Sequence, residues 1–202
     1  QAKCQLQGAK YDIISNAEWM TIARNIESME LNLSASLYSR GWSGNSVDDL
    51  WTNTLVAQIT SASCLYNDGQ NICSSSGEHL YKRFHYLTSG QEIWDFAGNL
   101  WEWVDYDHTQ AGFQNFPSSS CSVDWVEFSE VDCGHDIIDT SIFSPQGNLS
   151  SSDGVGRFQG GTNGAMLRGG GISSGANAGI YDLSLNGNSQ DPLYGFRCVY
   201  RP

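Results

Sequence analysis

The sequence has few charged residues, and basic residues are the scarcer kind. Charged residues make up 16% of the 202 residues, and ten lysines and arginines stand against 22 aspartates and glutamates, a formal net charge of −12. Binding to nucleic acid or to an anionic membrane needs a basic face, so neither is an expected partner. No apolar run approaches the roughly 18 residues of a membrane-spanning helix, and we expect no membrane insertion of this segment.

Several motifs of enzyme and metal chemistry are also missing. The sequence contains no Cys-x-x-Cys pair and no HExxH, so a structural zinc site and a zinc protease lack support. The triple glycine 169–171 lacks the lysine of a phosphate loop. The histidines show no metal-ligand spacing, and we expect structural or surface roles for all four: His79, His85, His108 and His135.

Cysteines, in contrast, are present in an even number. Six cysteines in a chain rich in serine, asparagine and glycine indicate three disulfides and an oxidising compartment. The count alone leaves many pairings open, and six reduced, buried thiols are the alternative. Order and spacing favour two short local links and one link between the chain ends: Cys64–Cys73, Cys121–Cys133 and Cys4–Cys198.

The apolar pattern predicts helical structure near the start of the chain. Ser15-Asn16-Ala17-Glu18 fits a capping box, in which Ser15 caps the helix and Glu18 reaches back to it. Apolar residues follow at helical spacing: Trp19, Ile22, Ala23, Ile26 and Met29. A second, weaker helix or an irregular segment is predicted over 47–59.

Later segments are typical of short strands. Residues 83–94 predict a β-hairpin that turns at Thr88-Ser89-Gly90. Further strands are predicted over 165–168, 179–185 and 195–200. The long stretch 105–164 is expected to be an irregular insertion held by Cys121–Cys133. We therefore expect residues 1–202 to form one loop-rich α+β domain whose ends meet in a small sheet.

A tryptophan-rich segment, residues 93–104, carries a candidate metal site. Asp95 and Glu102 flank a glycine-containing turn that can aim the carbonyls of Gly98 and Leu100 at one point. Calcium binds about six to eight oxygen ligands and mixes carboxylates with backbone carbonyls. These four residues therefore predict a structural Ca²⁺ site. The alternative is that Asp95 caps a turn and Glu102 pairs with an arginine.

Residues 172–194 are a candidate binding segment. They mix serine, asparagine, aspartate, tyrosine and glycine between two rigid-looking flanks, 167–170 and 195–198. Tyrosine among small polar residues is the composition of adaptable binding surfaces. An ordinary surface loop followed by a strand is the alternative.

Three motifs resemble those of the formylglycine-generating-enzyme, or sulfatase-modifying-factor, family. They are Gly98-Asn99-Leu100-Trp101-Glu102-Trp103, Leu167-Arg168-Gly169-Gly170 and Gly195-Phe196-Arg197-Cys198. Residues 14–20 also fit that family's first helix. The resemblance is strongest to short, non-catalytic microbial members and implies a C-type-lectin-like fold. Nothing in it corresponds to residues 105–164.

The resemblance also implies roles for particular residues. The family's calcium loop falls on Asp95, Gly98, Leu100 and Glu102, and its structural disulfide falls on Cys4–Cys198. The enzymes carry a reactive cysteine pair between the last two motifs, but residues 171–194 contain no cysteine. The histidine and glutamate iron site of related sulfoxide synthases is missing too, so we expect a protein that is not an enzyme.

Several non-catalytic relatives resemble the variable proteins of diversity-generating retroelements, in which the corresponding segment is a hypervariable ligand-binding face. That resemblance implies ligand-facing roles for Ile172, Ser173, Ser174, Ala176, Asn177, Ile180, Tyr181, Asp182, Ser184, Asn186, Asn188, Ser189, Asp191 and Tyr194. Gln190-Asp191-Pro192 does not match the sugar-binding motifs of C-type lectins, so sugar chelation by calcium is not supported.

These observations predict an extracellular, cell-surface or virion-surface recognition domain that binds a protein or cell-surface ligand through residues 171–194. Calcium and disulfides would keep this face rigid and so lower the ordering cost of binding. One alternative is a self-assembling structural subunit of a surface filament, pilus or virion. A lesser alternative is an oxidoreductase like the formylglycine-generating enzymes.

Overall fold

The computed structural model describes residues 1–34, 37–38, 40–41, 43, 84–105, 124–132, 140–161, 165–187 and 191–202. The helices and strands are α1 (Ala2–Gln5), β1 (Tyr11–Ile13), α2 (Asn16–Glu27), β2 (Leu33–Ser34), β3 (Leu37–Tyr38), β4 (Phe84–Tyr86), β5 (Glu92–Trp94), β6 (Trp101–Trp103), β7 (Trp125–Val126), β8 (Phe158–Gln159), β9 (Ala165–Arg168), β10 (Leu183–Gly187), β11 (Tyr194–Phe196) and β12 (Cys198–Tyr200). Short 3-10 helices η1 (Glu30–Asn32), η3 (Phe128–Glu130), η4 (Thr140–Ile142), η5 (Ser151–Asp153) and η6 (Gly175–Asn177) lie between them.

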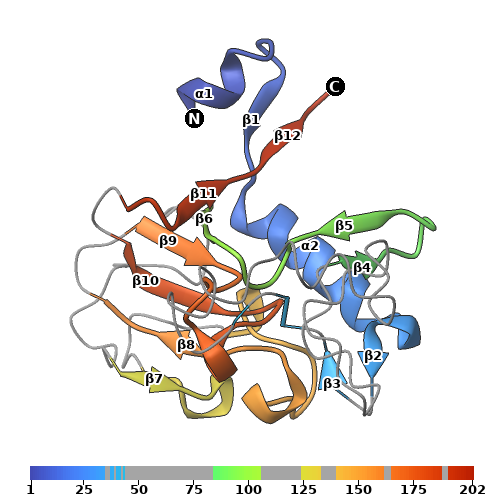
Figure 1. The fold of residues 1–202 in the computed structure, drawn as a ribbon, viewed down its shortest axis with the longest axis vertical. Helices are drawn as coiled ribbons and strands as arrows, with labels where there is room; N and C mark the ends of the chain where they lie inside the picture. The colour runs from blue at the N-terminus through green and yellow to red at the C-terminus, as the bar shows by residue number, and fades with distance from the viewer. Residues whose placement is uncertain are drawn as a thin grey trace, which may run out of the picture.

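These elements form a loop-rich, mixed α+β structure, which confirms the predicted class. Strands β11-β6-β9-β10-β8-β7 form a six-stranded sheet that combines parallel and antiparallel pairs. Helix α2 lies beside this sheet, with the two-stranded sheets β4-β5 and β2-β3 beyond it (Figure 1). No helix within the described ranges is long and apolar enough to span a membrane.

Helix α2 begins where the capping box predicts. The Ser15 hydroxyl accepts a hydrogen bond from the Glu18 backbone N–H at 3.2 Å, and the Glu18 carboxylate accepts one from the Ser15 N–H at 2.8 Å. The predicted apolar face is buried at Trp19, Ala23 and Ile26. The indole of Trp19 stacks on Phe96, with ring centroids 4.0 Å apart, so the helix packs directly against the tryptophan-rich segment.

The six-stranded sheet separates two rows of side chains, because successive residues of a strand point to opposite faces. Cross-strand partners on the inner face are Glu102, Arg168, Leu183, Phe158 and Val126, and four of these five side chains are fully or almost fully buried. Partners on the outer face are Trp103, Leu167, Ser184, Gln159 and Trp125. The register therefore places the core on one side and a row of aromatic and neutral polar groups on the other.

A buried arginine joins the sheet to the rest of the core. Arg168 is 0% exposed, and its guanidinium donates to Asn16 Oδ1 at 3.1 Å, to the Tyr181 carbonyl at 2.8 Å and to the Phe143 carbonyl at 3.3 Å. Burial lowers the pKa of Arg168 to about 9, so the group stays charged at neutral pH. One side chain thus connects strand β9 to the start of α2 and to two loops.

The stretch 105–164 contributes more to the fold than the predicted insertion. Its strands β7 and β8 extend the six-stranded sheet, and Phe128, Phe143 and Phe158 belong to the hydrophobic core. These aromatic residues follow neither helical nor strand periodicity, so local pattern could not identify them. The links Cys121–Cys133 and Cys64–Cys73 and the predicted helix over 47–59 lie outside the described residues.

The other strand predictions hold with shifted bounds. The hairpin is β4 paired with β5, and β9 has the predicted limits. Strand β10 starts only at Leu183, because Gly179 and Asp182 close a turn through an Asp182 N–H to Gly179 carbonyl bond of 3.0 Å. The predicted strand 195–200 is divided in two at Arg197, with β11 in the large sheet and β12 paired to β1.

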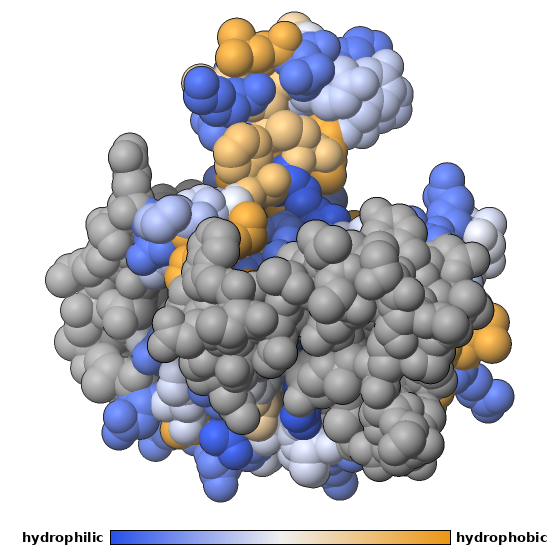
Figure 2. Space-filling model, in the orientation of Figure 1, coloured by the Kyte–Doolittle hydropathy of each residue, from blue (hydrophilic) through white to orange (hydrophobic). Residues whose placement is uncertain are grey.

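The two ends of the chain form a linked ribbon, as predicted. Cys4 and Cys198 form a disulfide with 5.4 Å between their Cα atoms, and β1 pairs antiparallel with β12. The ribbon and α1 stand out from the rest of the molecule, and both termini lie at this end of it (Figure 1). Figure 2 shows hydrophobic atoms on this projection, where Leu6 is 77% exposed.

An ion pair between Arg201 and Glu18 joins the terminal ribbon to the start of α2, and its contribution to the stability of the fold depends on pH. The Arg201 guanidinium donates to both carboxylate oxygens of Glu18, at 2.9 and 2.7 Å, and lowers the pKa of Glu18 from 4.5 to about 2. Because the folded-state pKa is the lower one, the pair stabilises the fold above about pH 4.5, and this contribution is lost as the pH falls toward about 2. Solvent screening of a partly exposed pair limits it to about 1 kcal/mol.

We expect Glu18→Gln, which keeps a capping-box side chain but removes the charge, to be less stable than wild type at about pH 6, and we expect this gap to close as the pH falls through about 2. Urea unfolding at a series of pH values measures this gap. Glu30→Gln, at an exposed position in η1, is the control and should show no gap that closes with pH. A pH-independent gap for Glu18→Gln would contradict the assignment.

Candidate functional site

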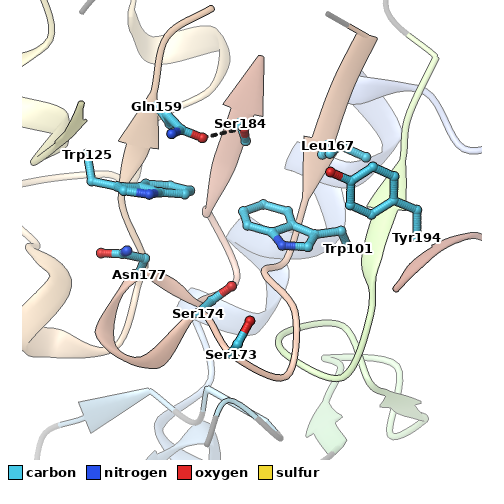
Figure 3. A pocket seen from close by; sticks show the side chains of 9 residues that line it. All are labelled: Trp101, Trp125, Gln159, Leu167, Ser173, Ser174, Asn177, Ser184 and Tyr194. Carbon is cyan, nitrogen blue, oxygen red and sulfur yellow. Dashed lines mark hydrogen bonds between the residues drawn. The ribbon is translucent and has the colours of Figure 1, made fainter. Parts of the chain in front are cut away.

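A pocket of about 270 Å³ lies on the outer face of the six-stranded sheet (Figure 3). Every strand of the sheet contributes one lining residue. In spatial order from β11 to β7 these are Tyr194, Trp101, Leu167, Ser184, Gln159 and Trp125. Ser173, Ser174 and Asn177 complete the lining from the loop that follows β9. The pocket is therefore a product of the sheet register and not of one local segment.

Two tryptophans from distant strands define its shape. Trp101 and Trp125 reach toward each other across the sheet, with Ser173, Ser174 and Asn177 on one side of the rings in Figure 3 and Gln159 and Ser184 on the other. Their rings are nearly parallel, 23° apart, with centroids separated by 5.8 Å. This is the offset arrangement that aromatic pairs prefer.

Glycines allow the loop to approach one of these rings. A Cβ at position 171 would lie 2.9 Å from Trp101 Cδ1, so only glycine fits beside the indole. Gly170 has φ +81°, and a Cβ there would lie 2.6 Å from the Asp182 carboxylate. The triple glycine, which matched no phosphate loop, thus passes between Trp101 and the buried Asp182.

Backbone hydrogen bonds hold the loop that covers the pocket. The Gly171 N–H donates to Ser174 Oγ at 2.9 Å, and the Ser174 N–H donates to the Gly171 carbonyl at 3.1 Å. Further along, the Asn177 carbonyl accepts from the Arg157 N–H at 3.1 Å. The loop is thereby fixed before any ligand arrives, which lowers the ordering cost of binding.

The polar groups of the pocket are uncharged, and several have no partner within the part of the chain that the structure describes. The Asn177 amide, the Ser173 and Tyr194 hydroxyls and the two indole N–H groups make no hydrogen bond there. Ser184 is different, because its hydroxyl donates to Gln159 Oε1 at 2.8 Å. Burial raises the pKa of Tyr194 above 10, so its hydroxyl is neutral at physiological pH. The site offers neutral donors and acceptors beside aromatic faces.

The structure brings part of the predicted binding segment together here. Ser173, Ser174, Asn177, Ser184 and Tyr194 line the pocket. Ala176 and Asp191 are exposed but do not line it, and Ile172 is almost fully buried. The side chain of Asn186 and residues Asn188 and Ser189 lie outside the described part of the chain.

Ile180, Tyr181 and Asp182 were expected to face a ligand, and the structure places them in the core instead. All three are 0% exposed. The Ile180 carbonyl accepts from Trp19 Nε1 at 2.9 Å, and the Tyr181 hydroxyl donates to the Glu27 carboxylate. Burial raises the pKa of Asp182 well above its usual value. These three residues belong to the core beneath the outer face of the sheet, because the turn that leads into β10 is buried.

Sequence reasoning did not include Trp101, Leu167, Gln159 and Trp125 among the binding residues. The alternation Trp101-Glu102-Trp103 in a strand signals that the tryptophans and Glu102 point to opposite faces, so Trp101 and Leu167 were within reach of a pattern argument. Trp125 and Gln159 lie in strands of two residues inside an irregular stretch. No periodicity marks such short elements.

Of the predicted calcium residues, Glu102 lies in β6 and points to the inner face of the same sheet. Arg197 Nη2 is 2.6 Å from Glu102 Oε1 and also donates to the Asp95 carbonyl. Glu102 thus pairs with an arginine, as the alternative interpretation held. Asp95 adopts φ +51°, and Gly98 follows in a positive-φ conformation with its N–H bonded to the Gly169 carbonyl at 2.9 Å. The turn is tightly held, but it contains no group of three metal-ligating side chains, nor does any other described region.

One carboxylate oxygen in this turn remains compatible with a cation. Glu102 Oε2 is buried and has no hydrogen-bond partner within the described ranges. Burial raises the pKa of Glu102 to about 7 despite the arginine, and the charge of Asp95 contributes in the same direction. A hard cation beside Oε2 would relieve both effects, so this one oxygen is compatible with the predicted Ca²⁺, for which the carbonyls of Gly98 and Leu100 remain predicted ligands.

A second hollow, of about 390 Å³, contains none of the predicted site residues. It is lined by Phe128, Ser129, Ser144, Pro145, Gly147, Asn148, Leu149 and Ser150.

Searches against protein-family models and against curated proteins each found no match to this chain.

The calcium hypothesis predicts a pH-dependent thermal shift. Ca²⁺ should raise the melting temperature of the wild type by mass action, and more at about pH 8 than at about pH 6, because the cation needs ionised Glu102. In Glu102→Gln the shift should be lost. Glu92→Gln, at an exposed position of β5, is the matched control and should keep the wild-type shift.

The result that would contradict this hypothesis is a Ca²⁺ shift of equal size in the wild type and in Glu102→Gln. A further variant, Asp95→Ala, should melt at the same temperature with Ca²⁺ and with chelator.

Proposed function

We propose that this protein is a non-catalytic recognition domain of an extracellular, cell or virion surface, with a C-type-lectin-like fold. It binds a protein or cell-surface ligand through the pocket on the outer face of its six-stranded sheet. The observation that carries this proposal is the pocket itself, in which Ser173, Ser174 and Asn177 meet Trp101 and Trp125. Clefts that combine aromatic surface with a few convergent polar groups are typical ligand sites.

The arrangement of the molecule supports binding over assembly of a filament. The pocket loop is fixed by its own hydrogen bonds, and its floor is fixed by the sheet register, so the site is formed in advance. Preorganised sites lose little conformational entropy when a ligand binds. The Cys4–Cys198 disulfide supports an oxidising, extracellular setting.

The motif resemblance supports the same proposal. The three motifs that are similar to the formylglycine-generating-enzyme family include residues of β6, of β9 and the glycines after it, and of β11 and β12. The segment between the last two motifs supplies five pocket residues and contains no cysteine. These features support the proposal that the chain is a non-catalytic relative of that family, with structural Ca²⁺ near Glu102.

A blocked pocket tests this proposal. Ser173 is exposed at the pocket, so Ser173→Trp fills the site without disturbing the core, while Ser89→Trp places the same side chain at an exposed hairpin turn. We expect ligands selected on the wild type, from a phage-displayed peptide library and a printed oligosaccharide array, to bind Ser89→Trp fully and Ser173→Trp weakly or not at all. Biolayer interferometry measures each affinity.

Equal affinity of Ser173→Trp and wild type for every selected ligand would contradict recognition through this face, as would failure of both libraries to give a ligand. Near-ultraviolet circular dichroism of the two variants checks that each is folded.

A further inference from the structure

The aromatic lining of the pocket indicates which ligand it takes. Trp101 and Trp125 both line the pocket, and their rings are nearly parallel, with centroids 5.8 Å apart. Rings with centroids 5.8 Å apart leave no space for a group between them, so a ligand meets only the parts of the two rings that line the pocket. A pyranose ring has a flat face of C–H bonds that packs well on such electron-rich surface.

The polar lining matches the rest of such a ligand. Ser173, Asn177 and Tyr194 offer side-chain donors and acceptors that have no partner within the described residues, and both indole N–H groups are free in the same sense. An apolar peptide side chain would bury these groups without partners, which is costly. A sugar carries hydroxyls around its rim, so it satisfies them while its C–H face covers the indoles.

Charge excludes the common anionic ligands. No arginine or lysine is among the described residues that line the pocket, and the chain as a whole carries a net charge of −12. Phosphate, sulfate and carboxylate groups need a cationic or strongly donating partner. The ligand chemistry that fits is therefore uncharged.

The size of the pocket limits how much ligand enters it. Its volume of about 270 Å³ lies just below the range of about 300–1,000 Å³ that is usual for small-molecule sites. A single ring, such as the terminal residue of an oligosaccharide, fits this space.

We propose that the pocket binds the terminal, uncharged sugar ring of a surface glycan by stacking on Trp101 and Trp125, without calcium contacting the sugar. The inference rests on the proposed function and names its ligand class. The candidate calcium residue Glu102 points to the opposite face of the sheet from Trp101, so a cation there cannot bridge to the ligand.

A glycan array of neutral, sialylated and sulfated oligosaccharides, followed by titration with free methyl glycosides of the best neutral binders, tests this inference. We expect neutral glycans to bind and to change the tryptophan fluorescence.

Trp125→Ala should lower the affinity by about ten-fold or more, while Trp125→Phe, which keeps an aromatic face, should retain part of it. Trp94→Ala is the control, because Trp94 is a partly exposed tryptophan of β5 outside the pocket. Binding should persist in chelator at a temperature where the protein stays folded.

Each other outcome is decisive. If only peptides bind, and Ser173→Trp abolishes their binding, the sugar inference is overturned while the proposed function stands. If only sialylated or sulfated glycans bind, or if chelator abolishes neutral-glycan binding by folded protein, the inference is likewise overturned. If neither glycans nor peptides bind the wild type, both the inference and the proposed function fail.

Discussion

The buried guanidinium of Arg168 is the interaction on which the rest of this structure depends. It donates to Asn16, to the Tyr181 carbonyl and to the Phe143 carbonyl, and so joins the first turn of α2, the turn before β10 and the loop after η4. Removing it would leave these buried acceptors without a donor, which is more costly than the net value of each bond. The direction of this one side chain also fixes the register of β9.

That register connects the core to the pocket. Because Arg168 points inward, its neighbour Leu167 points outward into the pocket floor, and cross-strand pairing carries the same division to Ser184, Gln159 and Trp125. A slip by one residue would exchange the two rows completely. The geometry of the candidate site is therefore set by a polar interaction on the opposite side of the sheet.

The sequence predicts those parts of this arrangement that depend on residues close together in the chain. The capping box at Ser15 and Glu18 and the strand β9 are local patterns, and the structure confirms both. The Cys4–Cys198 link followed from order and from family resemblance, and it is also confirmed. These features need only short stretches of sequence, or a pairing for which few partners exist.

The remaining features depend on contacts between distant parts of the chain. The burial of Tyr181 and Asp182 follows from their contacts with α2 and with the glycines after β9, and a polar composition could not reveal it. Trp125 reaches the pocket because a two-residue strand joins a sheet edge. Composition indicated residues 172–194 as a candidate binding segment, but only three-dimensional packing separates its buried residues from those that line the pocket.

The most direct test of this division is a single-site variant library of residues 165–196, displayed on yeast and sorted for resistance to protease. The account predicts that Arg168, Ile180 and Tyr181 tolerate almost no substitution, while Ser173 and Asn177 tolerate most, because the former are fully buried in the core and the latter have side chains that make no hydrogen bond within the described residues. Equal intolerance at both sets of positions would show that the pocket residues are part of the structural frame, and would contradict the account.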